Sequence, residues 1–170
     1  NIIKYEALSL AILDFIEDYN IKIEQKFSIL VNSGPGSFSG IRIALAVTKG
    51  IQLVKKLNIY TYNYFILNAA PYLKKTDKLI SIIKTNNFYY YTEGHFNRNY
   101  KFTEPKKLDL SFLNKNNSLV IISEELKNDE IIKNTDKKKI CIAKFDLKNI
   151  DILIENNLLE NKLIKPVYLS

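Results

Sequence analysis

The chain has 170 residues, of which 46% are hydrophobic and 25% charged, and its formal net charge is +7. This length suffices for one ordinary domain or for two small lobes that share a core. Its longest apolar stretches, such as Leu119–Ile122, are far shorter than the roughly 20 residues that cross a bilayer. A single cysteine, Cys141, excludes an internal disulfide framework. We therefore expect a globular, cytoplasmic protein without a membrane span.

The positive charge is a weak indication of nucleic-acid binding. Proteins that read phosphates and bases specifically favour arginine, and the only arginines of the chain are Arg42 and Arg98. We interpret most lysines as a solvated surface. The run Lys137–Lys139 is interpreted as a loop first and a nucleic-acid contact second.

Hydrophobic periodicity predicts a helix, strand, helix, strand order in the first part of the chain. Tyr5–Tyr19 is apolar at helical spacing over most of its circumference, and Phe27–Val31 is a short apolar run of strand length. Ile41–Lys56 has helical spacing again, and Ile59–Tyr64 has the length and composition of a strand. This order favours an α/β sheet with crossover helices.

The remainder of the chain continues as strands with a few helices. Leu79–Ile83 and Phe88–Thr92 flank tandem asparagines, which is typical of a β-hairpin. Residues 97–118 are rich in Lys and Asn and are predicted to form a loop. The later elements are two strands and two helices, the last helix with Asp146 as its N-cap: Leu119–Ile122, Glu124–Asn134, Ile140–Ala143 and Leu147–Leu158.

A glycine-rich loop between the first strand and the second helix is the most specific segment. Gly34 and Gly36 permit positive φ or close backbone approach, and Ser39 is the expected cap of the following helix. Such a loop could present amide groups to an anion, but its glycine spacing fits neither a dinucleotide site nor a Walker loop. A structural turn is therefore favoured over a phosphate site. The loop comprises Gly34, Pro35, Gly36, Ser37, Phe38, Ser39 and Gly40, followed by Arg42.

This segment is similar to the hallmark of the TsaB family, which typically reads Gly-Pro-Gly-Ser-Phe-Thr-Gly-Leu-Arg. Ser39 and Ile41 are conservative replacements within it. The resemblance extends to Asn68–Ala70 and reaches Pro166–Leu169, which is similar to the end of the family's core. It implies an actin-like (ribonuclease H-like) mixed sheet with flanking helices.

The resemblance also implies a division into two lobes and an incomplete first lobe. The expected lobes are residues 1–72 and residues 73–170. The family's first β-hairpin, with its Asp-Thr-Ser motif, is missing, and the sequence contains no methionine. We therefore expect about thirty to forty further N-terminal residues in the native protein, enough for a hairpin of typical strand length.

By the same resemblance, the chain is expected to be a non-catalytic partner subunit. The implied complex transfers threonylcarbamoyl to the tRNA adenosine next to the anticodon, and this chain stabilises a TsaD-type catalytic subunit. It binds no cofactor itself, because ATP and metal are handled by partners that include a TsaE-type ATPase. A homodimer is a further possibility, and tRNA is reached only through the complex. The alternative is a nucleotide-binding enzyme of the actin-like ATPase superfamily that uses Gly34–Gly40.

No catalytic or metal-binding constellation is visible in the sequence. His95 is the single histidine, next but one to Glu93, whereas a zinc or iron site needs several converging ligands. Ser37 and Ser39 have no histidine base nearby in the sequence. We expect neither catalytic nor metal-binding residues in this chain.

The two N-terminal helices are the candidate partner surface. Each is apolar over a wider arc than one sheet can cover. Leu13, Leu45, Tyr5 and Ile16 are the candidate partner-facing residues, and Val47 is expected to face the domain's own core. Aspartate at Leu13 or Leu45 should then abolish the complex, while aspartate at Val47 should unfold the domain.

Overall fold

The computed structural model describes residues 2–23, 27–85, 88–133, 135–144, 146–161, 166–167 and 169. The chain divides into two compact units. The first comprises Asn1–Asn63 with Leu159–Tyr168, and the second comprises Tyr64–Leu158 with Leu169–Ser170. The boundary therefore differs from the expected one at residue 72, because Phe65 and Leu67 are fully buried in the second unit.

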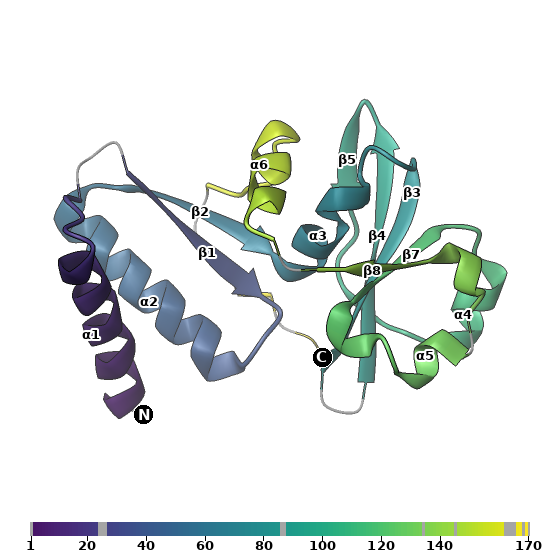
Figure 1. Ribbon diagram of the computed structural model, residues 1–170, viewed down its shortest axis with the longest axis horizontal. Helices are drawn as coiled ribbons and strands as arrows, with labels where there is room; N and C mark the ends of the chain where they lie inside the picture. The colour runs from purple at the N-terminus through teal and green to yellow at the C-terminus, as the bar shows by residue number, and fades with distance from the viewer. Residues whose placement is uncertain are drawn as a thin grey trace. The chain divides into compact units, whose positions relative to one another are not determined.

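The first unit is built on two parallel strands joined by a crossover helix (Figure 1). The strands are in register from Ser28 opposite Asn58 to Asn32 opposite Tyr62. The two helices of this unit also contact each other. The elements in order are α1 (Ile2–Asp18), β1 (Ser28–Gly34), α2 (Phe38–Lys55) and β2 (Asn58–Asn63). These four confirm the predicted helix, strand, helix, strand order.

Helix α2 packs on this two-stranded sheet through a face that differs from the predicted one. Leu45 is only 8% exposed and clusters with Ile41 of its own helix and with Val31 and Ile59 of the strands. Val47, the expected core residue, lies on another side of the helix and is only half-buried. The prediction that Leu45 faces a partner is therefore wrong. Both sides of α2 are apolar, so periodicity alone does not identify which side meets the sheet.

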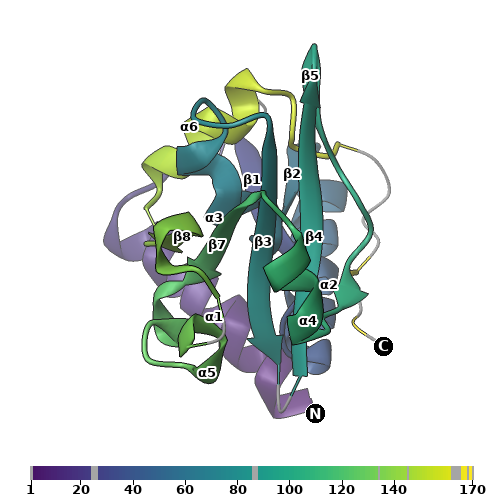
Figure 2. The ribbon, with the colours of Figure 1, turned by 90° about the vertical axis from the view of Figure 1, so that its right-hand side faces the viewer.

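The second unit contains a mixed six-stranded sheet with the order β5-β4-β3-β7-β8 and β6 paired to β4. Strands β3 and β4 form the predicted antiparallel hairpin, and β7 and β8 add to β3 in parallel. The strands are β3 (Lys78–Thr85), β4 (Phe88–Asn97), β5 (Asn99–Phe102), β6 (Lys106–Lys107), β7 (Leu119–Ser123) and β8 (Ile140–Ala143). The mixed pairing and the helices on both faces agree with the expected fold class (Figure 2).

Short helices cover both faces of this sheet. One face packs Ile80, Ile82 and Ile122 against side chains from α4 and α5, and the other packs Leu79 and Ile121 against α3 and α6. The helical segments are α3 (Tyr64–Ala69), η1 (Ala70–Tyr72), α4 (Leu110–Lys115), η2 (Glu124–Leu126), α5 (Glu130–Lys133), η3 (Lys137–Lys139) and α6 (Lys148–Glu155). Successive side chains of β3 therefore point to opposite faces of the sheet and contribute to an apolar layer on each face.

Three local predictions in this unit are corrected. Residues 97–118 contain β5, β6 and α4 rather than a loop, because Tyr100 and Leu113 supply buried anchors within a polar sequence. The predicted helix Glu124–Asn134 is split into η2 and α5 by a turn that ends at Asp129. At the last helix, Asp146 accepts a hydrogen bond from the amide of Lys148 at 2.9 Å, although Leu147 occupies the cap position itself.

Candidate functional site

The glycine-rich loop forms a capped strand-to-helix turn. Ser37 is the N-cap of α2, and its hydroxyl accepts a hydrogen bond from the amide of Gly40 at 3.3 Å. Its carbonyl accepts the amide of Ile41 at 2.9 Å. Ser39, the predicted cap, instead lies in the first turn of the helix with its hydroxyl 3.3 Å from that of Ser37. The helix thus begins two residues earlier than a cap at Ser39 implies.

Gly34 is the loop residue that only glycine can occupy. Its φ is +122°, and an added Cβ would lie 2.7 Å from the carbonyl oxygen of Val167. The same neighbour donates its amide to the carbonyl of Ser33 at 2.8 Å, so the backbone of Val167 lies close to the turn. Gly36, in contrast, has ordinary contact space for a Cβ, 3.6 Å from Ile41. The hallmark glycine therefore serves close packing of two backbones.

We expect Gly34→Ala to destabilise the first unit by about 2 kcal/mol or more, because it combines a disfavoured φ with a backbone clash. Gly50→Ala is the matched control. Gly50 lies inside α2 with nothing within 4 Å of the added Cβ. That change should stabilise by up to about 1 kcal/mol through helix propensity. Chemical denaturation of both variants checks the difference, and equal effects at the two glycines would contradict it.

The loop satisfies several of its own amides. Gly34 donates to the side chain of Asn32 at 2.9 Å, and the amides of Gly40 and Ile41 are bound by Ser37. Pro35 has no amide hydrogen. Phe38 is exposed at the start of α2, and the guanidinium of Arg42 lies 4.5 Å from its ring centroid. This arrangement favours a structural turn that presents a cation–aromatic pair.

An apolar groove lies between α1 and α2 in the first unit. Its volume is about 390 Å³. Two of the predicted partner residues, Leu13 and Ile16, line it together with Val47, the residue expected in the core. The full lining is Ser9, Ile12, Leu13, Ile16, Ile23, Val47, Gly50, Ile51, Val54 and Lys55. The apolar stripe of α2 that contains Val47, which the sequence predicts to face the core, therefore lies beside α1.

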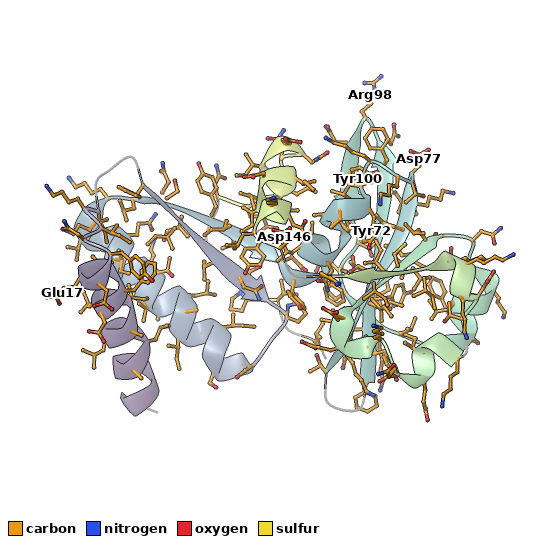
Figure 3. All side chains as sticks on the ribbon, in the orientation of Figure 1. Glu17, Tyr72, Asp77, Arg98, Tyr100 and Asp146 are labelled. Atoms are coloured by element: carbon orange, nitrogen blue, oxygen red, sulfur yellow. The ribbon has the colours of Figure 1, made fainter. Side chains whose placement is uncertain are left out.

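The remaining surface of α1 is also rich in exposed apolar side chains. Leu13 is 59% exposed although it borders the groove. Phe15 and Tyr19 are exposed on the same helix, with ring centroids 4.8 Å apart. Glu17 points away from α2 (Figure 3). The side chain of Tyr5, the fourth predicted partner residue, lies outside the described part of the chain.

The titratable candidates from the sequence do not converge. The Nε2 atom of His95 lies 3.8 Å from the carboxylate of Glu93, and both side chains are partly exposed. Within the described residues, no three His, Cys, Asp or Glu side chains are grouped as metal ligands would be. None of the described helices combines the length and the apolar character of a membrane span.

A polar cluster near α5 has no local signal in the sequence. Asp129 accepts hydrogen bonds from the ammonium of Lys84 at 2.8 Å, from the hydroxyl of Tyr89 and from the amide of Ile131. Burial raises the pKa of Asp129, but these three hydrogen bonds outweigh it and the net pKa is lowered. The pKa of Lys84 is raised, chiefly by its bond to Asp129. Lys84 and Tyr89 are 40 or more residues from Asp129 in the sequence, so no short motif contains the cluster.

Because of this cluster, we expect the stability of the protein to fall at acid pH. The lowered pKa of Asp129 contributes stability that is present above the ordinary aspartate value of about 3.9 and lost as pH falls through the folded value. Asp129→Asn should therefore be less stable than the parent at neutral pH, and the difference should shrink below about pH 4. Urea denaturation across pH 2–7, roughly the span of the titration, measures it. A difference that stays constant with pH would contradict the assignment.

Comparison with known proteins finds relatives both by sequence and by structure. No family model matches the chain. The chain is 28% identical over 175 residues to the tRNA threonylcarbamoyladenosine biosynthesis protein TsaB of Buchnera aphidicola subsp. Baizongia pistaciae (strain Bp), covering 92% of this chain and 79% of that protein. This sequence similarity supports the predicted TsaB family. Within that family the hallmark segment is the turn around Gly34 described above.

The structural neighbours agree with the family's fold. A structure described as YeaZ from Pseudomonas aeruginosa aligns with a TM-score of 0.64 and 13% identity, over 97% of this chain and 84% of that one. A second structure, described as an uncharacterized protein with similarity to peptidase YEAZ from Pseudomonas aeruginosa, gives a TM-score of 0.60 and 12% identity, over 94% and 81% of the two chains. At these identities the likeness concerns the fold, which is actin-like.

Proposed function

We propose that this TsaB-family chain is a non-catalytic subunit in tRNA threonylcarbamoyladenosine biosynthesis. In this role it binds and stabilises a TsaD-type catalytic subunit through the groove between α1 and α2. The biosynthetic role rests on the name of the sequence relative. The observation that carries the binding role is the apolar, open groove, which α1 and α2 leave uncovered within the described first unit.

The groove has the properties of a helix-binding surface. Ile12, Ile16 and Ile51 line it with aliphatic side chains, while Lys55 supplies a charge at its border. Monomeric proteins rarely leave contiguous apolar surface of this kind exposed. An apolar helix of a partner would bury these side chains at about 25 cal/mol per Å². Two partner helices that pack against α1 and α2 would cover the groove and complete a four-helix contact.

The alternative function, a nucleotide-binding enzyme that uses Gly34–Gly40, has less support. A phosphate site at the start of α2 requires amides directed at the ligand. Here Gly34, Gly40 and Ile41 donate their amides to the chain itself. We therefore assign ATP and metal to the partner subunits, including a TsaE-type ATPase. The complex acts on tRNA in the cytoplasm, and self-association through the same groove competes with complex formation.

Two measurements on the full-length protein separate these functions. The non-catalytic assignment predicts co-elution with a TsaD-type subunit in size-exclusion chromatography. It also predicts no measurable ATP binding by the isolated protein in calorimetry. Tight ATP binding by the isolated protein, together with no co-elution, would favour the enzyme and overturn the proposal.

A further inference from the structure

The end of the β4–β5 hairpin carries a second, polar cavity in the second unit. Its volume is about 500 Å³, within the range of small-ligand sites. It differs from the groove in chemistry, because ammonium, carboxylate, hydroxyl and amide groups border it alongside two aromatic rings. The polar and aromatic residues of its lining include Lys74, Lys75, Thr76, Asp77, Phe96 and Tyr100.

An aromatic platform at this cavity is held in place by backbone contacts. Phe96 is 46% exposed, and its ring centroid lies 5.0 Å from that of Tyr100 on the neighbouring strand. The hydroxyl of Tyr100 donates to the carbonyl of Thr76 at 2.7 Å, and the amide of Phe96 donates to the carbonyl of Asp77 at 2.9 Å. A half-exposed ring fixed in this way can stack against a planar ligand.

Basic side chains surround the same end of the sheet. Lys74 and Lys75 border the cavity, and Arg98 occupies the tip of the hairpin with φ of 66° (Figure 3). On the other face of the sheet, Lys78, His95 and Lys101 occupy one row across three strands. That row lies on the face opposite Phe96 and Tyr100, so Lys74 and Lys75 are the cations that a ligand in the cavity would meet.

Carboxylates offset part of this charge. Glu155 lies 3.4 Å from Lys74 at the exposed surface, and Glu93 lies 3.8 Å from His95. Asp77 borders the cavity. Burial raises the pKa of Tyr100, and the charge of Asp77 raises it further. Around the cavity and the hairpin tip, three cations (Lys74, Lys75 and Arg98) are thus accompanied by two carboxylates (Asp77 and Glu155).

We propose that this cavity binds a nucleotide of single-stranded RNA. The base stacks on Phe96, Asp77 accepts a hydrogen bond from an exocyclic amino group, and the backbone phosphates lie towards Lys74 and Lys75. Stacking on an exposed aromatic ring next to a basic track is the usual recognition mode for single strands. The inference extends the proposed function, since the chain would then contact tRNA directly rather than only through its partner.

The stacking part is tested with Phe96→Ala in the full-length protein. The probe is a short unstructured oligoribonucleotide with a fluorescent label, and anisotropy gives the Kd. Loss of one stacked base should weaken binding about 10- to 100-fold. Phe88→Ala is the matched control, because Phe88 is 47% exposed at the opposite end of the same strand. Phe96→Ala with the affinity of the parent, or equal weakening in both variants, would overturn the site.

The phosphate part is tested by the salt dependence of the same affinity. The double variant Lys74→Ala with Lys75→Ala should reduce the slope of log K against log salt by about 0.7 for each phosphate that the protein no longer neutralises. The control removes the same charge at Lys137 and Lys138 on η3. An equal reduction in the control would mean diffuse attraction and overturn the site.

Adenosine monophosphate serves as the second probe and distinguishes a free nucleotide from an RNA segment. The proposal expects much weaker binding of the mononucleotide, and equal affinity of the two probes would contradict it. Co-elution with the catalytic subunit is measured in parallel. Phe96→Ala should leave that co-elution unchanged, so failure of the RNA site and failure of the proposed function remain separate results.

Discussion

Leu45→Asp should unfold the first unit. Leu45 is 8% exposed and packs between Ile41, Val31 and Ile59, so the change places an unpaired carboxylate among aliphatic side chains. Such a substitution costs about 3–5 kcal/mol. Domains have a total stability of about 5–15 kcal/mol. We expect a large fall in the melting temperature and a decrease in the helical circular dichroism of this unit.

The same substitution at Leu53 is the control for Leu45→Asp. Leu53 lies on α2 as well, but its side chain is strongly exposed. Leu53→Asp should change the free energy of unfolding by less than about 0.5 kcal/mol. If Leu45→Asp remained folded with the melting temperature of Leu53→Asp, the assignment of this face of α2 to the sheet would be wrong.

Leu13→Asp should abolish association with the catalytic subunit while the isolated protein stays folded. Leu13 borders the groove and is 59% exposed in the free chain, so the carboxylate is solvated there. In the complex it would be buried without a partner, which costs several kcal/mol of binding. A loss of about 4 kcal/mol weakens binding roughly a thousandfold. Titration calorimetry and thermal melting measure the two effects.

The control for the partner surface is Leu10→Asp. Leu10 lies on α1 with a similar exposure of 57%, but it does not line the groove. We expect this variant to bind the catalytic subunit with nearly the affinity of the parent. Equal effects at Leu10 and Leu13 would place the interface elsewhere on α1, and no effect at either would remove α1 from it.

The sequence predicts the helices and strands well where the apolar face of an element packs against a single neighbouring element. Helix α1, strand β1 and strand β2 lie where periodicity and length place them. The failure concerns α2, which has the sheet on one side and α1 on the other. Leu45, expected to face a partner, packs against the sheet, and Val47, expected in the core, lines the groove beside α1. Both sides of α2 are apolar, and periodicity identifies an apolar stripe but not the element that it contacts. Only the three-dimensional arrangement decides between them.

The sequence predicts that the glycine-rich loop is a capped turn, but it does not predict which serine caps the helix or why Gly34 must be glycine. The requirement for glycine at Gly34 depends on Val167, which is distant in the sequence, and local patterns do not carry that information. The cap at Ser37 rather than Ser39 reflects two serines at competing positions, both acceptable as N-caps. The cluster of Asp129 with Lys84 and Tyr89 is equally non-local. Such groups are determined by sheet order rather than by spacing.

Reconstitution of tRNA threonylcarbamoylation from purified subunits tests the central claim most directly. The full-length protein is added to, or omitted from, a mixture of the TsaD-type subunit, the TsaE-type ATPase, threonylcarbamoyl-adenylate, ATP and tRNA. We predict modified tRNA only when the chain and the catalytic subunit are both present, no turnover by the chain alone, and no rescue by Leu13→Asp. Turnover by the chain alone, or full activity in its absence, would contradict its role as a non-catalytic partner.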